Sequence, residues 1–276
     1  MICFPTCKIN LGLRITNKRA DGFHALETVF FPISIKDALE IIIEPDTNAA
    51  PITFTSSGLA INGDPSDNLC FKAYGLLKKD YPTIPNIKMH LHKTIPMGAG
   101  LGGGSADGAF TLVALNQLFN LQLSVDKLMQ YALTLGSDCP FFIINTPAFA
   151  TGRGEILKPI NVNLDGYRIV IVNPGIAIST KLAFSLIIPQ VPDTNMEAII
   201  CEPVTSWKEN LINDFEAPIF NSFPEIANIK ETLYQKGAVY ASMTGTGSTV
   251  YGIFPTSIID TLDFDFPTHY FVATSS

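Results

Sequence analysis

Short apolar runs alternate with polar breaks along the first part of the chain. Three runs rich in β-branched and aromatic residues lie at 9–13, 28–33 and 39–43. Such runs are typical of strands. Within residues 87–95, the apolar Ile87, Met89 and Leu91 alternate with polar residues, which predicts a strand that is buried on one face.

Other segments have helical spacing, with apolar residues three and four positions apart. This spacing occurs in 68–79, 106–118 and 124–135. We expect further helices around 205–220 and 224–236. Gly237 follows the last of these, where a glycine commonly ends a helix.

The C-terminal half mixes strands and helices. We expect a strand at 167–173, a proline-broken loop at 189–197, and a hairpin that pairs 239–243 with 249–254. Strands and helices follow one another without a regular strand–helix–strand alternation. The sequence therefore predicts an α+β fold.

Composition and charge exclude several classes of protein. The chain has 276 residues, 47% of them hydrophobic and 16% charged, with a net charge of −7. The length suggests about two domains, and the acidic balance argues against non-specific nucleic-acid binding, which needs basic faces. No apolar run approaches the ~18 residues of a membrane span, and the N-terminus lacks the features of a signal peptide.

The cysteines point to a reducing compartment. There are five, an odd number, and none form a Cys-x-x-Cys pair. Neither a disulfide framework nor a zinc ribbon is indicated. We therefore expect a cytoplasmic protein with no dedicated metal site.

The strongest chemical signal is a glycine-rich loop between a predicted strand and a predicted helix. Its residues are Pro96, Met97, Gly98, Ala99, Gly100, Leu101, Gly102, Gly103, Gly104, Ser105 and Ala106. Glycines let several backbone N–H groups converge on one point, and the helix that follows adds its own N-terminal N–H groups. The loop therefore predicts a phosphate-binding site.

Three other interpretations of the loop are weaker. A simple turn needs only one or two glycines. Gly98, Gly100 and Gly103 fit the dinucleotide-binding fingerprint, but that motif requires a strand after its helix, and a second helix is predicted at 124–135. The Walker A loop requires a lysine that this loop lacks.

Two further positions are candidates for chemistry. Asp138 follows the end of a predicted helix and precedes an apolar run, and its other interpretation is a cap for the next turn, which Pro140 would begin. Lys8 and Asn10 share one face of a predicted strand. A lysine in that position is often a solvated edge residue. His24 closes a tight turn, where a lone histidine is usually structural.

Taken in order, these motifs resemble the GHMP small-molecule kinases over residues 8–254. The matching segments are Lys8-x-Asn10, Arg19-x-Asp21-Gly22-x-His24, the loop from Pro96 to Ser105, Gly136-x-Asp138-x-Pro140-Phe141-Phe142, Asn213-Asp214-Phe215-Glu216, and Thr244-Gly245-Thr246-Gly247-Ser248. The triple glycine before Ser105 and the Asp21-Gly22-x-His24 turn are similar to those members whose acceptor carries cytidine diphosphate.

The resemblance implies a two-lobed fold with the active site in the cleft between the lobes. The N-terminal lobe, 1–150, would bind ATP, and the C-terminal lobe, 151–276, would cover the acceptor. The family's catalytic base matches Asp138, and its partner matches Lys8. Mg²⁺ would arrive with ATP. The oligomeric state is not implied, and neither nucleic acid nor membrane is an expected partner.

The resemblance also implies two sets of binding residues. The glycine-rich loop through Ala106 would hold the ATP phosphates, and Asn68 and Lys93 would contact the adenosine end. The acceptor-site positions are Asn10, Phe23, His24, Thr180 and Phe184. The rings of Phe23 and Phe184 are expected to stack on cytosine, while His24 contacts the edge of the base.

Two departures from the family and two rival functions stay open. The family commonly has Tyr where this chain has Phe23, which keeps a ring but loses a hydroxyl. Ser-Asp/Asn-Ala-Ala usually follows the loop, and here the residues are Ala106-Asp107-Gly108-Ala109. The rivals are a non-catalytic nucleotide-binding protein and a GHMP kinase with another acceptor, such as homoserine or a sugar.

Overall fold

The computed structural model describes residues 1–46, 48–61 and 63–275, which form two compact units interleaved along the chain. The first unit comprises Met1–Cys7, Ile35–Met97 and Gly102–Asn145; the second comprises Lys8–Ser34, Gly98–Leu101 and Thr146–Ser276. The sequence predicts a single boundary near residue 150 instead. The lobes 1–150 and 151–276 stay a prediction, while the contacts place 8–34 and 98–101 with the C-terminal half.

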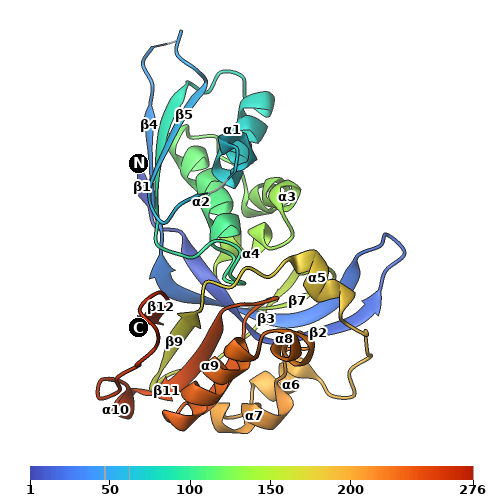
Figure 1. Cartoon of the computed structure of the whole chain (residues 1–276). Coiled ribbons are helices and arrows are strands. Elements are labelled where there is room, and N and C mark those ends of the chain that lie inside the picture. The colour runs from blue at the N-terminus through green and yellow to red at the C-terminus, as the bar shows by residue number, and fades with distance from the viewer. Residues whose placement is uncertain (47, 62, 276) are drawn as a thin grey trace. The chain divides into compact units, whose positions relative to one another are not determined.

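The first unit is a four-stranded sheet with helices packed on it (Figure 1). Its elements are β1 (Ile2–Cys3), β4 (Ala38–Ile43), β5 (Ile52–Gly58), a 3₁₀ turn (Pro65–Asp67), α1 (Leu69–Asp80), β6 (Ile87–Lys93), α2 (Gly103–Leu118), α3 (Val125–Leu135) and α4 (Cys139–Ile144). The strand order is β1-β4-β6-β5, with β5 parallel to β6 and the other pairs antiparallel. Helices α1 and α2 contact each other and the sheet.

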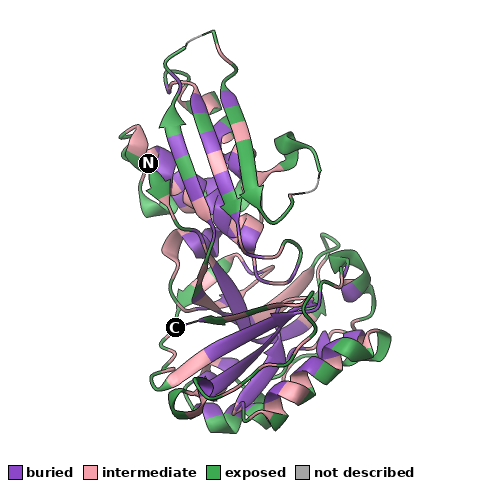
Figure 2. Ribbon diagram, turned by 60° about the vertical axis from the view of Figure 1, so that its left-hand side comes forward, coloured by how far each residue is buried: buried purple, intermediate pink, exposed green. Residues whose placement is uncertain are grey.

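Strand β6 has buried residues at every second position. Ile87, Met89 and Leu91 are buried, whereas Lys88 and His92 are exposed. Figure 2 shows the resulting alternation of buried and exposed positions along the strands. Because successive side chains point to opposite faces, the apolar set lies on the buried face of the strand, as the sequence predicts.

Gly108 explains one departure from the family pattern. A Cβ on this glycine would lie 2.8 Å from the Cβ of Leu69, which begins α1. A glycine inside a helix costs up to ~1 kcal/mol of helix propensity. Here it lets α1 and α2 approach closely, so packing offsets the lost propensity.

The second unit contains two four-stranded sheets. Its strands are β2 (Thr6–Lys18), β3 (His24–Lys36), β7 (Ala148–Thr151), β8 (Ile156–Pro159), β9 (Tyr167–Asn173), β10 (Tyr240–Met243), β11 (Val250–Pro255) and β12 (Phe271–Ser275). Its helices are α5 (Thr180–Ser185), α6 (Met196–Ile200), a 3₁₀ turn (Val204–Ser206), α7 (Trp207–Asn210), α8 (Glu216–Ser222), α9 (Pro224–Gln235) and α10 (Thr256–Ile259). The strand orders are β2-β3-β7-β8 and β10-β11-β9-β12.

Both faces of the β10-β11-β9-β12 sheet are covered. Helix α9 packs on β10 and β11 (Figure 1). On the other face, the hydroxyl of Tyr251 donates to the backbone carbonyl of Asn10 in β2, at 2.8 Å. Strands β9 and β11 are therefore apolar almost throughout, and residues 7–15 of β2 are also buried.

The prediction of one helix around 205–220 is wrong, because the chain leaves helical geometry between α7 and α8. The N–H of Asp214 donates to the carbonyl of Leu13 at 2.8 Å. The Asp214 carboxylate accepts from the N–H of Ile15 at 2.7 Å. Pairing with the buried strand β2 satisfies these groups better than a continued helix would.

Candidate active site

The first half of the glycine-rich loop is held by the β10–β11 hairpin tip, in the second unit. Gly98 and Gly100 have φ of +64° and +79°, a conformation that favours glycine. The carbonyl of Gly100 accepts from the Thr244 hydroxyl at 3.1 Å, and the carbonyl of Ala99 accepts from the N–H of Thr249 at 3.3 Å. The predicted hairpin is confirmed, and its tip fixes the path of the loop.

The second half of the loop begins α2, in the first unit. Gly102 is the N-cap residue, with φ of +71° and no capping side chain. The first helical bond runs from Ala106 N–H to the Gly102 carbonyl, at 2.9 Å. The N–H groups of Gly103, Gly104 and Ser105 therefore precede the helical ladder and form the kind of helix end that binds anions.

Lys8 is buried rather than solvated. Its side chain lies in β2 with the residue 3% exposed. The ammonium donates to Asn10 Oδ1 at 2.6 Å and to the Gly100 carbonyl at 3.2 Å, and it lies 5.1 Å from the centroid of the Phe30 ring. The alternative of a solvated edge lysine is thus wrong, and the ammonium lies against the glycine-rich loop.

Asn10 connects Lys8 to the hairpin tip. Its Oδ1 accepts from the Lys8 ammonium, from the Thr244 hydroxyl at 3.2 Å and from the Gly245 N–H at 3.0 Å. Its Nδ2 donates to the Thr28 hydroxyl at 2.9 Å. Both ends of the amide serve internal contacts and the residue is 2% exposed. In this structure Asn10 positions Lys8 and the tip, and its predicted contact with the acceptor stays a prediction.

Asp138 directly precedes α4 in the first unit and is half-buried. Pro140 lies in the first turn of that helix, as expected. The Asp138 carboxylate makes no capping hydrogen bond to the helix, so the alternative that it serves as a cap is wrong. Its predicted role as a base stays a prediction.

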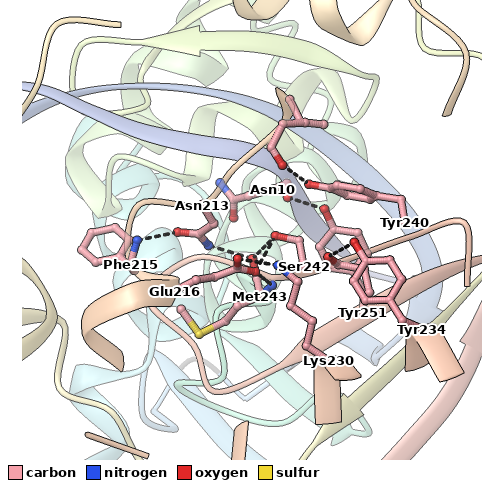
Figure 3. Close-up of polar contacts among 12 residues, drawn as sticks. Asn10, Asn213, Phe215, Glu216, Lys230, Tyr234, Tyr240, Ser242, Met243 and Tyr251 are labelled. Carbon is pink, nitrogen blue, oxygen red and sulfur yellow. Dashed lines mark hydrogen bonds and ion pairs between the residues drawn. The ribbon is translucent and has the colours of Figure 1, made fainter. Parts of the chain in front are cut away.

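The motif Asn213-Asp214-Phe215-Glu216 supports the hairpin tip, a role that sequence reasoning missed. Figure 3 shows Glu216 beside Ser242 and Met243. Glu216 Oε1 accepts from the Met243 N–H at 2.7 Å and from the Ser242 hydroxyl at 2.9 Å, and Oε2 pairs with Lys230 at 2.6 Å. Asn213 Nδ2 donates to the carbonyls of Met243 and Gly245, at 2.7 and 2.9 Å.

This network runs without a break from Lys230 to Lys8. Glu216 and Asn213 hold Met243 and Gly245, and the Gly245 N–H is bonded to Asn10. The polar residues Asn213 and Glu216, which lie in the family motif with Asp214, were the available signal. Their partners are distant in sequence, so spacing alone could not assign them.

The aromatic residues predicted for the acceptor form pairs in the second unit. The rings of His24 and Phe184 are stacked, with centroids 5.1 Å apart, and Phe184 packs edge-on against Phe215 at 5.0 Å. Phe23 is 56% exposed, and the Arg153 guanidinium lies 5.1 Å from its ring centroid. The stacking of cytosine between Phe23 and Phe184 stays a prediction.

Thr180 is the first residue of α5 and is exposed. Phe184 is in the same helix, so the two lie about one turn apart. The structure thus brings Thr180, Phe184 and His24 into one neighbourhood of the second unit. Contact of Thr180 with an acceptor stays a prediction.

The two residues predicted for the adenosine end have structural partners in the first unit. Asn68 caps α1, accepting from the Cys70 N–H at 2.8 Å. Lys93 lies between the carboxylates of Asp37 and Asp107, and all three side chains are buried. Sequence reasoning missed both aspartates as partners of Lys93. Contacts of Asn68 and Lys93 with a nucleotide stay predictions.

Within residues 1–46, 48–61 and 63–275, no three His, Cys, Asp or Glu side chains gather as a metal site. The five cysteines, all of them in this part of the chain, are free thiols. Among the described helices, none has the length and apolar character to cross a membrane.

Comparisons with known proteins show which family the chain resembles. The model of the GHMP kinases N terminal domain matches residues 68–152, and that of the GHMP kinases C terminal domain matches residues 200–261. A protein of Bacteroides fragilis named 4-diphosphocytidyl-2-C-methyl-D-erythritol kinase is 51% identical over 266 residues, 96% of each chain. A protein of the same name from Bacteroides thetaiotaomicron is 53% identical over 254 residues, 92% of each chain.

Solved structures show the same relationship. A crystal structure of a 4-(cytidine 5'-diphospho)-2C-methyl-D-erythritol kinase has a TM-score of 0.80 at 30% identity, covering 100% of this chain and 99% of that one. The mevalonate kinase of Methanococcus jannaschii has a TM-score of 0.71 at 14% identity, covering 100% and 97%. The second likeness shows the shared fold alone.

The fold, the glycine-rich loop and the two matched domains define an ATP-dependent kinase of the GHMP class. Within that class, the chain belongs to the 4-diphosphocytidyl-2-C-methyl-D-erythritol kinase family. The predicted α+β fold is confirmed.

Proposed function

We propose that this chain transfers the γ-phosphoryl group of ATP to the 2-hydroxyl of 4-diphosphocytidyl-2-C-methyl-D-erythritol, a step of non-mevalonate isoprenoid precursor synthesis. The relatives' names supply the acceptor. The observation that carries the chemistry is the buried Lys8 ammonium, which donates to a carbonyl of the glycine-rich loop. A desolvated cation beside a phosphate-binding loop suits a reaction in which charge stabilisation dominates.

The glycine-rich loop would hold the phosphates through backbone N–H groups. The open N–H groups of Gly103, Gly104 and Ser105 favour negative charge at the start of α2. The hairpin tip keeps Gly100 in place, so the loop does not need to reorganise when ATP binds. Preorganised donors of this kind stabilise developing charge at little cost.

Asp138 would act as the general base. The acceptor hydroxyl is a tertiary alcohol and a weak nucleophile, so a carboxylate within hydrogen-bond reach would accept its proton as the oxygen attacks phosphorus. Its carboxylate is not committed to capping α4. Lys8 is its proposed partner, as the family motifs imply.

Mg²⁺ would enter with ATP and would supply positive charge that offsets the charge of the phosphates. The described residues gather no cluster of carboxylates and histidines. Phosphate oxygens and water would therefore supply most of its ligands. The chain's own task is to position the nucleotide and to exclude water from the reacting groups.

The test is ADP release with a panel of acceptors and the purified enzyme. We expect turnover with 4-diphosphocytidyl-2-C-methyl-D-erythritol and none with homoserine, mevalonate or galactose. Turnover with another member of the panel alone would identify a GHMP kinase with a different acceptor. ATP binding without turnover of any acceptor would favour the non-catalytic alternative.

A further inference from the structure

A buried cluster of three charged side chains lies in the first unit, next to the start of α2. Lys93, at the end of β6, pairs with Asp37, just before β4, and with Asp107 of α2. The three side chains are 0%, 0% and 3% exposed. Two carboxylates share one ammonium, so the cluster carries one uncompensated negative charge when all three groups are ionised.

The two carboxylates are in unequal environments. Asp37 Oδ1 accepts from the backbone N–H groups of Thr94 and Ile95, at 2.6 and 2.9 Å, and its Oδ2 pairs with Lys93. Asp107 Oδ2 accepts from Lys93 at 2.8 Å. Asp107 Oδ1 is the buried side-chain oxygen that has no hydrogen-bond partner among the described atoms. A buried ionised oxygen without a donor is costly, so Asp107 is the residue that would hold a proton.

Lys93 and Asp37 are the charged side chains that act on Asp107 in the described part of the chain. Burial, opposed by Lys93 and assisted by Asp37, raises the pKa of Asp107 to about 7. The neighbouring titratable groups on other elements are the thiols of Cys70 in α1 and Cys3 in β1. Burial raises the pKa of Cys3 to about 11 and that of Cys70 well above its ordinary value, so both thiols stay neutral.

The cluster lies beneath the first turn of α2. A Cβ on Gly103 would stand 2.8 Å from Ile95 Cγ2 and 3.3 Å from Lys93 Nζ. Gly103 is also the first residue of α2, and its N–H precedes the helical hydrogen bonds. The charge of the buried cluster therefore acts on an anion bound at this turn through a poorly screened medium.

We propose that Asp107 takes up a proton when ATP binds, so that the first turn of α2 receives the triphosphate above a neutral cluster. This inference rests on the proposed function, because it requires the ATP phosphates at that turn. The proton comes from solvent, adds to the Asp107 carboxylate and leaves when the nucleotide dissociates. Asp107 is a positioning residue in this account, because it acts through the charge of the cluster and does not touch the nucleotide.

The linkage has a definite direction. ATP binds better when the cluster is protonated. The affinity for ATP is therefore highest below the pKa that Asp107 has in the chain without nucleotide, about 7, and it falls as pH rises above that value. If one proton is taken up with each ATP, the affinity for ATP falls up to tenfold for each unit by which the pH rises. Asp107→Asn keeps the size of the side chain and holds no titrating proton, so this part of the pH dependence should vanish.

Calorimetry of ATP binding with Mg²⁺ and without acceptor tests the inference in two buffers of different ionisation enthalpy. At pH 7.5 the wild type should take up more protons per ATP than Asp107→Asn, by up to one. Protonation of ATP itself cancels in this difference. Asp126→Asn, an exposed aspartate in the first turn of α3, is the matched control and should behave as the wild type does.

Equal proton uptake by the wild type and Asp107→Asn would overturn the inference and leave the proposed function standing. Failure of the wild type to bind ATP at any pH would overturn both. Should Asp107→Asn fold poorly, the wild type alone decides: after subtraction of the nucleotide's own titration, ATP should cause proton uptake and adenosine, which lacks phosphates, should not. Equal uptake with both ligands would also overturn the inference.

Discussion

The carbonyl oxygen of Thr244 lies against the α-carbon of Gly100, where a side chain would stand well inside van der Waals contact. Gly98 has a similar positive φ but nothing within 4 Å of its missing Cβ. Alanine at either position carries the same backbone strain, of ~1 kcal/mol. The difference between the two variants therefore isolates the contact between the loop and the hairpin tip.

We expect Gly100→Ala to weaken ATP binding at least ~10-fold relative to Gly98→Ala, because the added methyl group pushes the loop off the Thr244 carbonyl. Calorimetric titration with ATP measures the difference, and thermal unfolding shows whether each variant is folded. Equal affinities for ATP in two folded variants would mean that the hairpin tip does not determine the conformation of the glycine-rich loop.

Asp138 is tested through the chemical step. Asp138→Asn keeps the shape of the side chain but removes its basicity, so kcat should fall at least ~100-fold. ATP affinity should stay within about a factor of two, because the phosphates are expected at the loop. Asp126→Asn provides the comparison with an exposed aspartate. Turnover of purified Asp138→Asn near the wild-type level would refute the assignment of the base.

The parts of the fold that follow from local pattern were predictable. The alternation over 87–95 yields β6, and the helical spacing over 68–79 yields α1. The hairpin also agrees, with Met243 opposite Val250. In each case the period of the apolar residues matches one buried face, and local propensity agrees with the tertiary packing.

What could not be predicted depends on partners distant in sequence. The segment around Asn213 leaves the helix to pair with β2, nearly 200 residues earlier by the spacing of Ile15 and Asp214. The sequence around Lys8 is typical of a solvated edge residue. Its burial could not be predicted, because it depends on residues distant in sequence that cover β2. The charge balance of Lys93 likewise depends on Asp37, which lies 56 residues away.

Phe23 is suited to a test of acceptor recognition, because it is 56% exposed and outside the core. If its ring stacks on cytosine, Phe23→Ala should lower kcat/KM for the cytidylated acceptor by ~5- to 100-fold, the equivalent of ~1–3 kcal/mol. Methylerythritol 4-phosphate, which lacks the base, should be a poor acceptor for the wild type and should be unaffected by the substitution.

Phe4→Ala is the matched control, because Phe4 is 55% exposed and lies in the first unit. It should leave both kcat/KM values unchanged. A wild type that used both acceptors equally well would contradict the cytidine-binding interpretation. Equal losses for both acceptors in Phe23→Ala would instead indicate a role outside base recognition.

Glu216 should contribute strongly to stability. Glu216→Ala removes the carboxylate that accepts from the Met243 N–H, the Ser242 hydroxyl and the Lys230 ammonium. Breaking a largely buried ion pair of this kind costs ~3–5 kcal/mol. Glu231→Ala, on the exposed side of α9, should cost under ~0.5 kcal/mol. Denaturant unfolding measures both, and similar losses would mean that the network adds little.

The raised pKa of Asp107 also predicts how the free energy of unfolding depends on pH. Folding raises its pKa from 3.8 to about 7, so between these values the folded chain binds more protons than the unfolded one. The contribution of Asp107 is then most favourable at low pH and is lost as pH rises toward 7. Each unit of pKa shift corresponds to ~1.4 kcal/mol.

Relative to the wild type, Asp107→Asn should therefore become more stable by at least ~1 kcal/mol as pH rises from 4 to 7, with no further change above 7. Carboxylates outside the cluster are common to both proteins, so the difference between their unfolding free energies isolates the contribution of Asp107 and its pairing. Lys93 keeps its pairing with Asp37 in the variant, which preserves the fold beneath α2. Denaturant unfolding at several pH values measures this difference. A constant difference from pH 4 to 7 would show that Asp107 is ionised throughout, and the buried cluster would then carry its negative charge at every pH in that range.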